Sequence, residues 1–594
     1  ASSFMRRPCR PSRTRHAARR WCAGALLLLG RLWGCSPAIQ QAPPLPEAEL
    51  VQEGEAVVGS NQLGLRLTNK ARRRAGVVAR LELKTPAGRP LAHAQDLRLG
   101  PGVSRRVGLP FQAPEPGLYT GSLKVYEQGS NRLIRAFDGL SIPVWPRWEF
   151  TPDRSYYTGE AQLRFRGRLR RGRGEDKKLL VELRQGAQVR AREQLPFGNH
   201  EAAGAMPIAQ LPPGCYTLRA RLEGPGGIED SLSYPVCKYP PAPREVKIDL
   251  FTQGLLVEGK PFFPIGLYWL RAEDLGEVKR LGFNCGDYFY KLRGEEIAVL
   301  MDEAAQSGLR ILLELTPFIR GRAEPDHQAI AAAVERYRHH PALLAWYLVD
   351  EPADASVDPA QLAALYRQVR QADPYHPVYL VNNRPRTYGA YAGASDILAI
   401  DVYPVPDHPL TRVREYLQQA RLATQGRQPV WLVAQAFGGV EHWGRPPTPA
   451  ELRNMVFQGL VQGAGGLLFY RYCREEERGI QPAALWREMR ALAAELAPLE
   501  PVLTAPVSGV QPENTDGVPG VEALLRVYRG QYYLFVVNCR AVAQRTRFRL
   551  QGLPALARAE ALYQSQAPAL QDGLLVIDLA AWGAGIYRLE PAGT

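Results

Sequence analysis

The sequence lacks the features that mark several classes of protein. Eight cysteines in 594 residues are too few for a disulfide framework, and three of them lie in the first 35 residues. No Cys/His spacing suits a zinc site, and there is no HExxH motif. The glycine-rich run 463–466 precedes a strand-like segment instead of opening a helix, so it makes a poor phosphate loop. We therefore expect no metal and no cofactor.

A basic surface for nucleic acid is also missing. The net charge is +15, but eight arginines and no acidic residue lie within residues 1–35. About half of the net charge therefore belongs to this segment. The remaining charge is diffuse, without a basic stripe interleaved with aromatic residues. The sequence thus predicts no nucleic-acid partner.

Residues 1–35 have the pattern of an export signal. A basic region, 6–20, precedes the apolar run 23–30, which is too short to span a membrane as a helix. The segment Leu32–Cys35 resembles a bacterial lipoprotein signal, in which the cysteine is lipidated. An ordinary cleaved signal peptide is the alternative. Both predict an exported protein that is periplasmic, anchored to the outer membrane through Cys35, or extracellular, and the proline-rich segment 36–46 is typical of a linker.

Two β-sandwich modules are predicted at residues 47–146 and 147–240. Short alternating apolar segments with turn residues between them are typical of this class. The run Pro116–Thr120 is echoed by Pro213–Thr217, each placing a turn before a strand that contains tyrosine, as in immunoglobulin-like sandwiches. Nothing in either module resembles a binding site, which favours a spacer or packing role over carbohydrate binding.

Two further predictions concern the β-rich parts of the chain. Cys215 and Cys237 fall within the second module and could pair after export. Residues 501–594 return to short alternating apolar segments, so they predict a C-terminal β-sandwich.

Between these parts, residues 246–500 alternate strand-like and helix-like segments. Eight such units in about 250 residues match the size of a (β/α)8 barrel, the fifth helix being the weakest. The predicted fold class is therefore multidomain, a (β/α)8 TIM barrel flanked by N-terminal and C-terminal β-sandwich domains. The expected strands are 263–269, 283–289, 310–317, 343–350, 377–383, 397–404, 429–437 and 466–472.

The fourth of these strands is apolar until it ends in Asp350, Glu351 and Pro352. Acids at the C-terminal end of a barrel strand are typical of catalytic residues. The runs Val257–Gly266 and Trp346–Pro352 resemble the start of the barrel and the fourth-strand acid/base motif of clan A-like glycoside hydrolases. This resemblance implies a carbohydrate substrate and a general acid/base role for Glu351. Asp350 stands where those enzymes usually have asparagine.

The resemblance fails at a second position, where Gln435 ends the seventh strand in place of a nucleophilic glutamate. An amide cannot be that nucleophile, so three hypotheses stay open. In the first, the substrate's own 2-acetamido group attacks, Asp350 orients it and Tyr403 binds it, as the similarity of Asp350-Glu351 to hexosaminidase families 20 and 123 implies. In the second, Asp401 is the second carboxylate, with Glu441 and Asp287 as weaker candidates. In the third, the barrel binds carbohydrate without catalysis.

Aromatic and amide side chains near the strand ends form the predicted substrate-binding set, because sugar rings stack on aromatic faces. For each aromatic residue, packing in the core is an equal alternative. Arg471 could bind an acidic sugar or pair with an acid among residues 475–477, and Glu314 could face the barrel mouth or be a buried structural acid. The set is Tyr268, Trp269, Tyr288, Asn383, Tyr403, Gln435, Trp443 and Tyr470.

Overall fold

The computed structural model describes residues 45–51, 55–171, 174–477, 479–553, 555–563 and 565–592. The predicted export segment and nearly all of the predicted linker lie outside the described residues, so lipidation of Cys35 stays a prediction. Within the described ranges, no helix has the length and apolar character needed to cross a bilayer.

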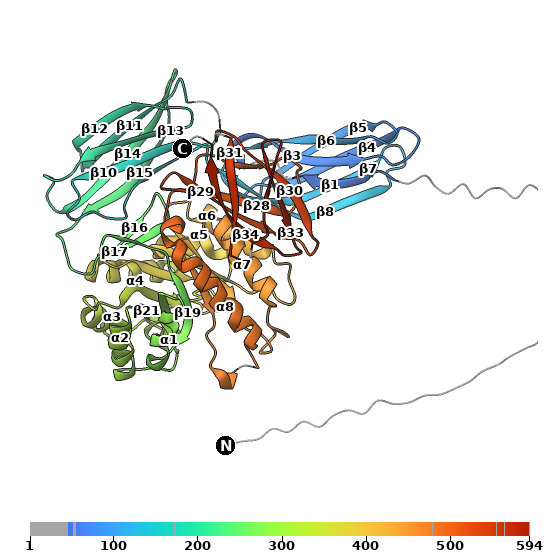
Figure 1. The fold of residues 1–594 in the computed structure, drawn as a ribbon. Helices are drawn as coiled ribbons and strands as arrows, with labels where there is room; N and C mark the ends of the chain where they lie inside the picture. Colours follow the sequence, from blue (N-terminus) through green and yellow to red (C-terminus); the bar gives the residue numbers. More distant parts are fainter. Residues whose placement is uncertain are drawn as a thin grey trace, which may run out of the picture. The chain divides into compact units, whose positions relative to one another are not determined.

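The centre of the chain is a closed barrel of eight parallel strands, which confirms the predicted fold class (Figure 1). Each strand is followed by a helix, as parallel pairing requires of its crossover connections. The strands are β19 (Ile265–Leu270), β20 (Cys285–Tyr288), β21 (Arg310–Glu314), β22 (Leu343–Asp350), β23 (Val378–Val381), β24 (Ile397–Val402), β25 (Val430–Gln435) and β26 (Leu467–Tyr470). The helices are α1 (Leu275–Arg280), α2 (Glu295–Ser307), α3 (His327–Tyr337), α4 (Pro359–Ala372), α5 (Tyr388–Tyr391), α6 (Arg412–Ala423), α7 (Pro449–Val461) and α8 (Ala483–Leu496).

Several barrel strands end earlier than the apolar runs predicted. β23 stops at Val381, two residues short of Asn383, and β21 stops at Glu314, before the 3₁₀ turn η2 (Thr316–Phe318). Just past these ends, the N–H groups of Leu315 and Asn382 still donate to the neighbouring strands, at the carbonyls of Tyr347 (2.7 Å) and Ala399 (3.0 Å). The fifth helix, expected to be weak, is the four-residue α5.

The barrel interior is closed at the N-terminal ends of its strands by a small antiparallel sheet. Its strands are β16 (Val246–Asp249), β17 (Gly254–Val257) and β18 (Lys260–Phe262). Val246 and Leu255 belong to the same buried cluster as the interior side chains Tyr347, Tyr379 and Trp431. The Val246 N–H donates to the carbonyl of Tyr375, just before β23 begins. The free end of the barrel is therefore its C-terminal end, where the acids predicted from the sequence lie.

Before the small sheet β16-β17-β18, the described residues form four sheets in two pairs. The first pair has the strand orders β1-β3-β6 and β2-β8-β7-β4-β5, and the second pair β13-β10-β9 and β12-β11-β14-β15. The strands are β1 (Glu47–Val51), β2 (Ala56–Val57), β3 (Gly59–Thr68), β4 (Ala75–Lys84), β5 (Pro90–Leu99), β6 (Ser104–Ala113), β7 (Gly117–Glu127), β8 (Leu133–Trp145), β9 (Trp148–Pro152), β10 (Gln162–Leu169), β11 (Lys178–Gln185), β12 (Gln188–Pro196), β13 (Glu201–Pro207), β14 (Gly214–Gly224) and β15 (Gly227–Lys238).

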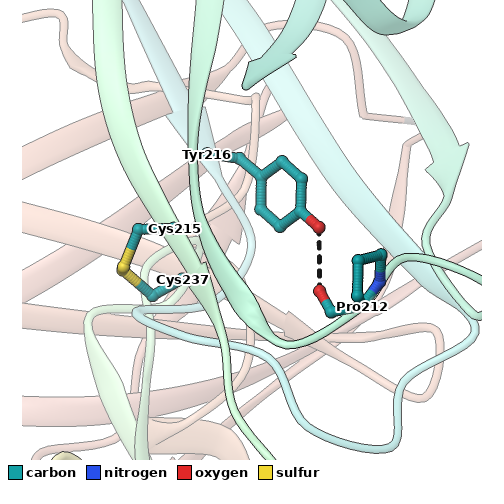
Figure 2. Close-up of a disulfide and its surroundings, with 4 residues drawn as sticks. All are labelled: Pro212, Cys215, Tyr216 and Cys237. Carbon is teal, nitrogen blue, oxygen red and sulfur yellow. Dashed lines mark hydrogen bonds between the residues drawn. A yellow bond between two sulfur atoms is a disulfide. The ribbon is translucent and has the colours of Figure 1, made fainter. Parts of the chain in front are cut away.

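The short repeat in these modules corresponds to one recurring tyrosine contact. The buried Tyr216 hydroxyl donates to the carbonyl of Pro212, four residues earlier, at 2.8 Å (Figure 2). In the first module the buried Tyr119 hydroxyl donates to the carbonyl of Glu115 at 2.9 Å. Beside Tyr216, Cys215 and Cys237 pair across β14 and β15, as predicted, and form a disulfide (Figure 2).

After the barrel, two four-stranded sheets form a C-terminal β-sandwich. Their strand orders are β27-β30-β33-β32 and β28-β29-β34-β31. The strands are β27 (Pro512–Asn514), β28 (Val521–Tyr528), β29 (Gln531–Asn538), β30 (Gln544–Leu550), β31 (Leu556–Leu562), β32 (Ala569–Gln571), β33 (Leu574–Leu579) and β34 (Ala584–Pro591).

Helix α7 is buried between the barrel and this sandwich. Phe457, on α7, and Phe535, on β29, lie in the same buried cluster. Asn454, fully buried on α7, donates from Nδ2 to the carbonyls of Asn538 (2.9 Å) and Trp582 (3.0 Å). One side chain therefore satisfies two backbone acceptors of the neighbouring module.

We expect Asn454→Leu to lower the free energy of unfolding by about 2–4 kcal/mol, because it removes the donor from one buried and one part-buried carbonyl. The midpoint of urea unfolding measures this change. Glu335→Gln, at a side chain on α3 that is 70% exposed, is the control and should stay within about 0.5 kcal/mol. Equal midpoints for the two variants would show that the Asn454 bonds do not hold the sandwich to α7.

Candidate active site

Glu351 lies directly after β22, at the C-terminal end of the barrel. Its φ is 45°, in the left-handed region that is unfavourable for residues other than glycine. Its N–H donates to the carbonyl of Val381 at 3.2 Å, and its Oε1 accepts a 2.8 Å hydrogen bond from Nδ2 of Asn383. The same Asn383 amide donates to Asp354 at 2.8 Å. The predicted acid is thus held by the residue that follows the neighbouring strand.

The carboxyl group of Asp401, near the end of β24, lies close enough to that of Glu351 for each group to shift the pKa of the other. A hydrogen bond between two carboxyl groups requires that one of them carries a proton. Asp401 is almost fully buried, so burial, followed by the charge of Glu351, raises its pKa well above the usual range. Burial also raises the pKa of Glu351, while the interaction with the Asp401 side chain opposes that rise. The two carboxyl groups therefore titrate as a pair, and burial favours the protonated form of each.

Asp350 points to different partners. Its Oδ1 accepts a 2.6 Å hydrogen bond from the Tyr347 hydroxyl, and its Oδ2 lies 3.5 Å from the guanidinium of Arg320. Its N–H donates to Thr316 Oγ1 at 3.0 Å. The sequence alone does not reveal these partners of the Asp350 carboxylate, which the structure identifies as Tyr347 and Arg320. Asp350 is a fixed carboxylate beside Glu351, and burial is the main cause that raises its pKa.

A second group of acids lies on β20 and on β21, the strand that pairs with β22. Asp287 is buried, and burial together with the charge of Glu314 raises its pKa well above the usual range. Burial raises the pKa of Glu314 to about 7. Its intermediate exposure leaves both alternatives, a group facing the mouth and a buried structural acid, as predictions. Glu441, the other weak candidate, is exposed in the loop after β25.

Aromatic rings form a wall on the other side of the mouth. Trp269 packs edge-to-face on Tyr470 (5.4 Å between ring centroids), and Tyr470 stacks on Tyr403 (5.7 Å). Tyr403 contacts Trp443 at 5.7 Å, and these four rings are half-buried. These four residues are half of the predicted substrate-binding set and most of its aromatic members. They lie together in positions that a sugar ring can reach. We call Trp269, Tyr470, Tyr403 and Trp443 the aromatic wall.

Two predicted substrate-binding tyrosines are packing residues instead. The Tyr268 hydroxyl is hydrogen-bonded to the Tyr379 hydroxyl at 2.9 Å, and the Tyr288 hydroxyl donates to the carbonyl of Glu314 at 3.1 Å. Tyr268 is 4% and Tyr288 1% exposed. Their hydroxyl groups hold the barrel interior together, because a buried phenol needs a partner.

Gln435 also does not face a substrate. It is fully buried, its Oε1 accepts from the N–H of Val405 at 2.9 Å, and its Nε2 donates to the carbonyl of Val405 at 2.8 Å. A third bond from Nε2 reaches the carbonyl of Phe437 at 3.3 Å. The amide therefore fixes the loop after β24, which explains physically why an amide stands at this position.

Sequence reasoning missed several residues around the mouth. Arg320 and Thr316 position Asp350, Asp354 shares the Asn383 amide, and the 45% exposed Tyr290 lies 5.0 Å from the Trp269 ring. All lie on loops after strands, where no periodic pattern marks them. Arg471 pairs with Glu477 at 2.9 Å, as one alternative predicted, and also lies 4.0 Å from the centre of the Trp269 ring. Among the described residues, no cluster of three or more His, Cys, Asp or Glu side chains is arranged to hold a metal.

Comparisons with known proteins add only distant structural likenesses. No protein-family model and no curated protein matches the sequence. Similar solved structures include a cyclomaltodextrinase, with a TM-score of 0.46 and 11% sequence identity; the match covers 75% of this chain and 99% of the cyclomaltodextrinase. An Anoxybacillus α-amylase matches with a TM-score of 0.41 and 11% identity, over 54% of this chain and 90% of the amylase. A β-D-glucuronidase of Dictyoglomus thermophilum has a TM-score of 0.32 at 13% identity, covering 74% and 90%. Scores of this size assign no activity, so the functional argument depends on the site itself.

Gln435→Glu tests whether the amide replaces a lost nucleophile. We expect the free energy of unfolding to fall by about 2–4 kcal/mol, because a buried carboxylate would face two carbonyls. The loss should be larger at pH 8 than at pH 5, since a carboxyl with a raised folded-state pKa loses stability as pH rises above its unfolded pKa of about 4.3. Thermal unfolding at both pH values measures it. A variant of unchanged stability with new or increased glycosidase activity would contradict the structural role of Gln435.

Proposed function

We propose that the protein is a glycoside hydrolase in which Glu351 is the general acid. The observation that carries this proposal is the pair of buried, mutually influencing carboxyl groups of Glu351 and Asp401 at the open end of a (β/α)8 barrel. A general acid must keep its proton near neutral pH, and burial of Glu351 raises its pKa in that direction. The aromatic wall faces the same end and supplies the apolar surface on which sugars stack.

Asp401 is the residue that holds Glu351, and we assign it a positioning role. Burial, followed by the charge of Glu351, raises the pKa of Asp401 well above its usual range. This shift works against the charged form that a nucleophile or base requires. It therefore supports a role through Glu351 over the second-carboxylate hypothesis.

The nucleophile is then the substrate's own acetamido group, with Asp350 as the residue that orients it. Asp350 is adjacent to Glu351, and Tyr347 and Arg320 fix its carboxylate. We propose that it orients the 2-acetamido group of the substrate, whose oxygen attacks the anomeric carbon while Glu351 protonates the leaving oxygen. The complete use of the Gln435 amide by backbone atoms supports this choice, since β25 then offers no nucleophile. Tyr403, in the aromatic wall, is the proposed partner of the acetamido oxygen.

We also propose that the enzyme acts outside the cytoplasm. The pattern of residues 1–35 supports export, either as a lipoprotein or as a secreted protein. The Cys215–Cys237 disulfide supports the same location, because such bonds persist mainly in oxidising compartments.

Glu351→Gln should abolish hydrolysis of aryl glycosides whose leaving groups need protonation, with a loss of about 10²–10⁴-fold in kcat/KM. A panel of aryl glycosides that includes 2-acetamido sugars measures it, and the exposed Glu335→Gln is the matched control. Turnover restricted to 2-acetamido substrates and lost in Asp350→Asn would support substrate assistance. Hydrolysis that survives Glu351→Gln unchanged would remove Glu351 from the mechanism.

A pair of Asp401 variants separates positioning from catalysis. In Asp401→Ala, Glu351 loses the side-chain interaction that lowers its pKa, so we expect the alkaline limb of the kcat/KM profile to move to higher pH. In Asp401→Asn, the amide can still donate to Glu351, so the limb should stay near that of the wild type. Loss of all turnover in Asp401→Asn, with the fold intact by circular dichroism, would instead make Asp401 a catalytic carboxylate.

A further inference from the structure

A groove lies beside the barrel mouth, between α8 and the segment formed by η1 (Ala272–Asp274) and α1. Its volume is about 720 Å³, within the range of about 300–1,000 Å³ typical of small-molecule sites. Its lining includes Asp274, Tyr472, Arg474, Trp486 and Arg487. None of these residues contributes to the carboxyl pair or to the aromatic wall, so the groove is a separate feature of the molecule.

The α8 side of the groove presents hydrogen-bond donors. Arg487 and Arg490, three residues apart on one face of the helix, line the groove and are exposed. Within the described ranges of the chain, neither guanidinium has a carboxylate within the 4.0 Å of an ion pair. Each therefore keeps its planar set of N–H donors available to a ligand.

The opposite side presents acceptors. Arg474 Nη2 lies 2.7 Å from Glu273 and 2.9 Å from Asp274, which fixes these carboxylates at the edge of the groove. Glu277, one turn further along α1, is exposed and also lines the groove. With acids on one side and guanidinium groups on the other, the groove has no strong charge of one sign. Facing rows of acceptors and donors suit a neutral ligand that is rich in hydroxyl groups.

Aromatic rings lie between these two sides. Tyr472 packs edge-to-face on Trp486 at 5.4 Å, and Trp486 stacks on Phe283 at 6.1 Å with an interplanar angle of 6°. Trp486 is only 8% exposed, so the groove meets one edge of a ring that the core holds rigid. An apolar surface between polar sides is the composition expected of a carbohydrate site.

The groove is also continuous with the mouth. A small hollow of about 10 Å³, close to the space of one water molecule, is lined by Trp269 and Arg471 at the mouth and by Tyr472 and Arg474 of the groove. The two hollows share Tyr472 and Arg474. The groove and the mouth are therefore neighbours that share part of their lining.

We propose that the groove binds a distal stretch of a neutral, hydroxyl-rich carbohydrate chain whose reactive end lies in the barrel mouth. This inference builds on the proposed function and deepens it, because it makes a long oligosaccharide or polysaccharide the substrate. Arg487 and Arg490 donate to the hydroxyl groups of the chain, Glu277 accepts from them, and Tyr472 and the edge of Trp486 contact the C–H surface of a sugar ring.

Affinity gel electrophoresis of the Glu351→Gln protein tests the groove without hydrolysis of the probe. The probes are soluble β-glucan, galactomannan, xylan and glycol chitin, with polygalacturonate as the acidic comparison. We expect at least one neutral polymer to retard migration, and Arg487→Ala/Arg490→Ala in the same background to weaken that binding about fivefold or more. Arg336→Ala/Arg367→Ala, which removes two exposed arginines from α3 and α4, is the charge-matched control and should bind like the parent.

Each contrary result overturns the inference. Absence of retardation by every neutral polymer, or equal retardation of the groove variant and its parent, removes the groove from carbohydrate binding. Stronger retardation by polygalacturonate than by any neutral polymer refutes the neutral class of ligand. Thermal unfolding of both double variants shows whether they are folded. The electrophoresis needs no turnover, so it tests the groove independently of the proposed function. If the protein binds polymers but has no glycosidase activity, only the proposed function is contradicted. If it hydrolyses aryl glycosides but binds no polymer, only the proposed role of the groove is contradicted.

Discussion

The electrostatic coupling between the carboxyl groups of Glu351 and Asp401 is the interaction on which the site depends. It exists only because β22 and β24, separated by β23, close into one barrel and bring their C-terminal ends to a common mouth. Burial disfavours the state in which both groups are charged, since two neighbouring charges in a poorly solvated site would repel strongly. Asn383, from the intervening strand, holds the same carboxyl group of Glu351 from another side.

The rest of the mouth divides into a polar and an aromatic half. Asp350, with Tyr347 and Arg320, continues the row of fixed acids, while the aromatic wall offers apolar surface opposite. Gln435 belongs to neither half, because its amide is used by the backbone of the loop that follows β24. The acids proposed for catalysis therefore lie at the ends of β22 to β24. The residues at the ends of the later strands shape the mouth around them.

The sequence predicts the barrel well because its strands are continuous apolar runs separated by amphipathic helices, a local pattern. It also predicts Glu351, because an acid that ends a buried strand stands out. It does not predict the Asp401 contact, which needs the register of two strands about fifty residues apart, nor the bonds of Gln435, which depend on a loop conformation. The groove combines Asp274 with Arg487, residues over two hundred positions apart, so no local pattern marks it. For the same reason Tyr268 and Tyr288 were predicted at the mouth, although their hydroxyls bond inside the barrel.

The positive φ of Glu351 links activity to stability in this fold. A residue with a Cβ in the left-handed region costs about 1 kcal/mol or more relative to glycine, and the chain accepts that cost at the position of its proposed acid. Glycine at this position would relax the backbone while removing the carboxyl group. In a lineage without selection for hydrolysis, the single substitution Glu351→Gly would therefore stabilise the fold and remove the proposed catalytic acid at the same time.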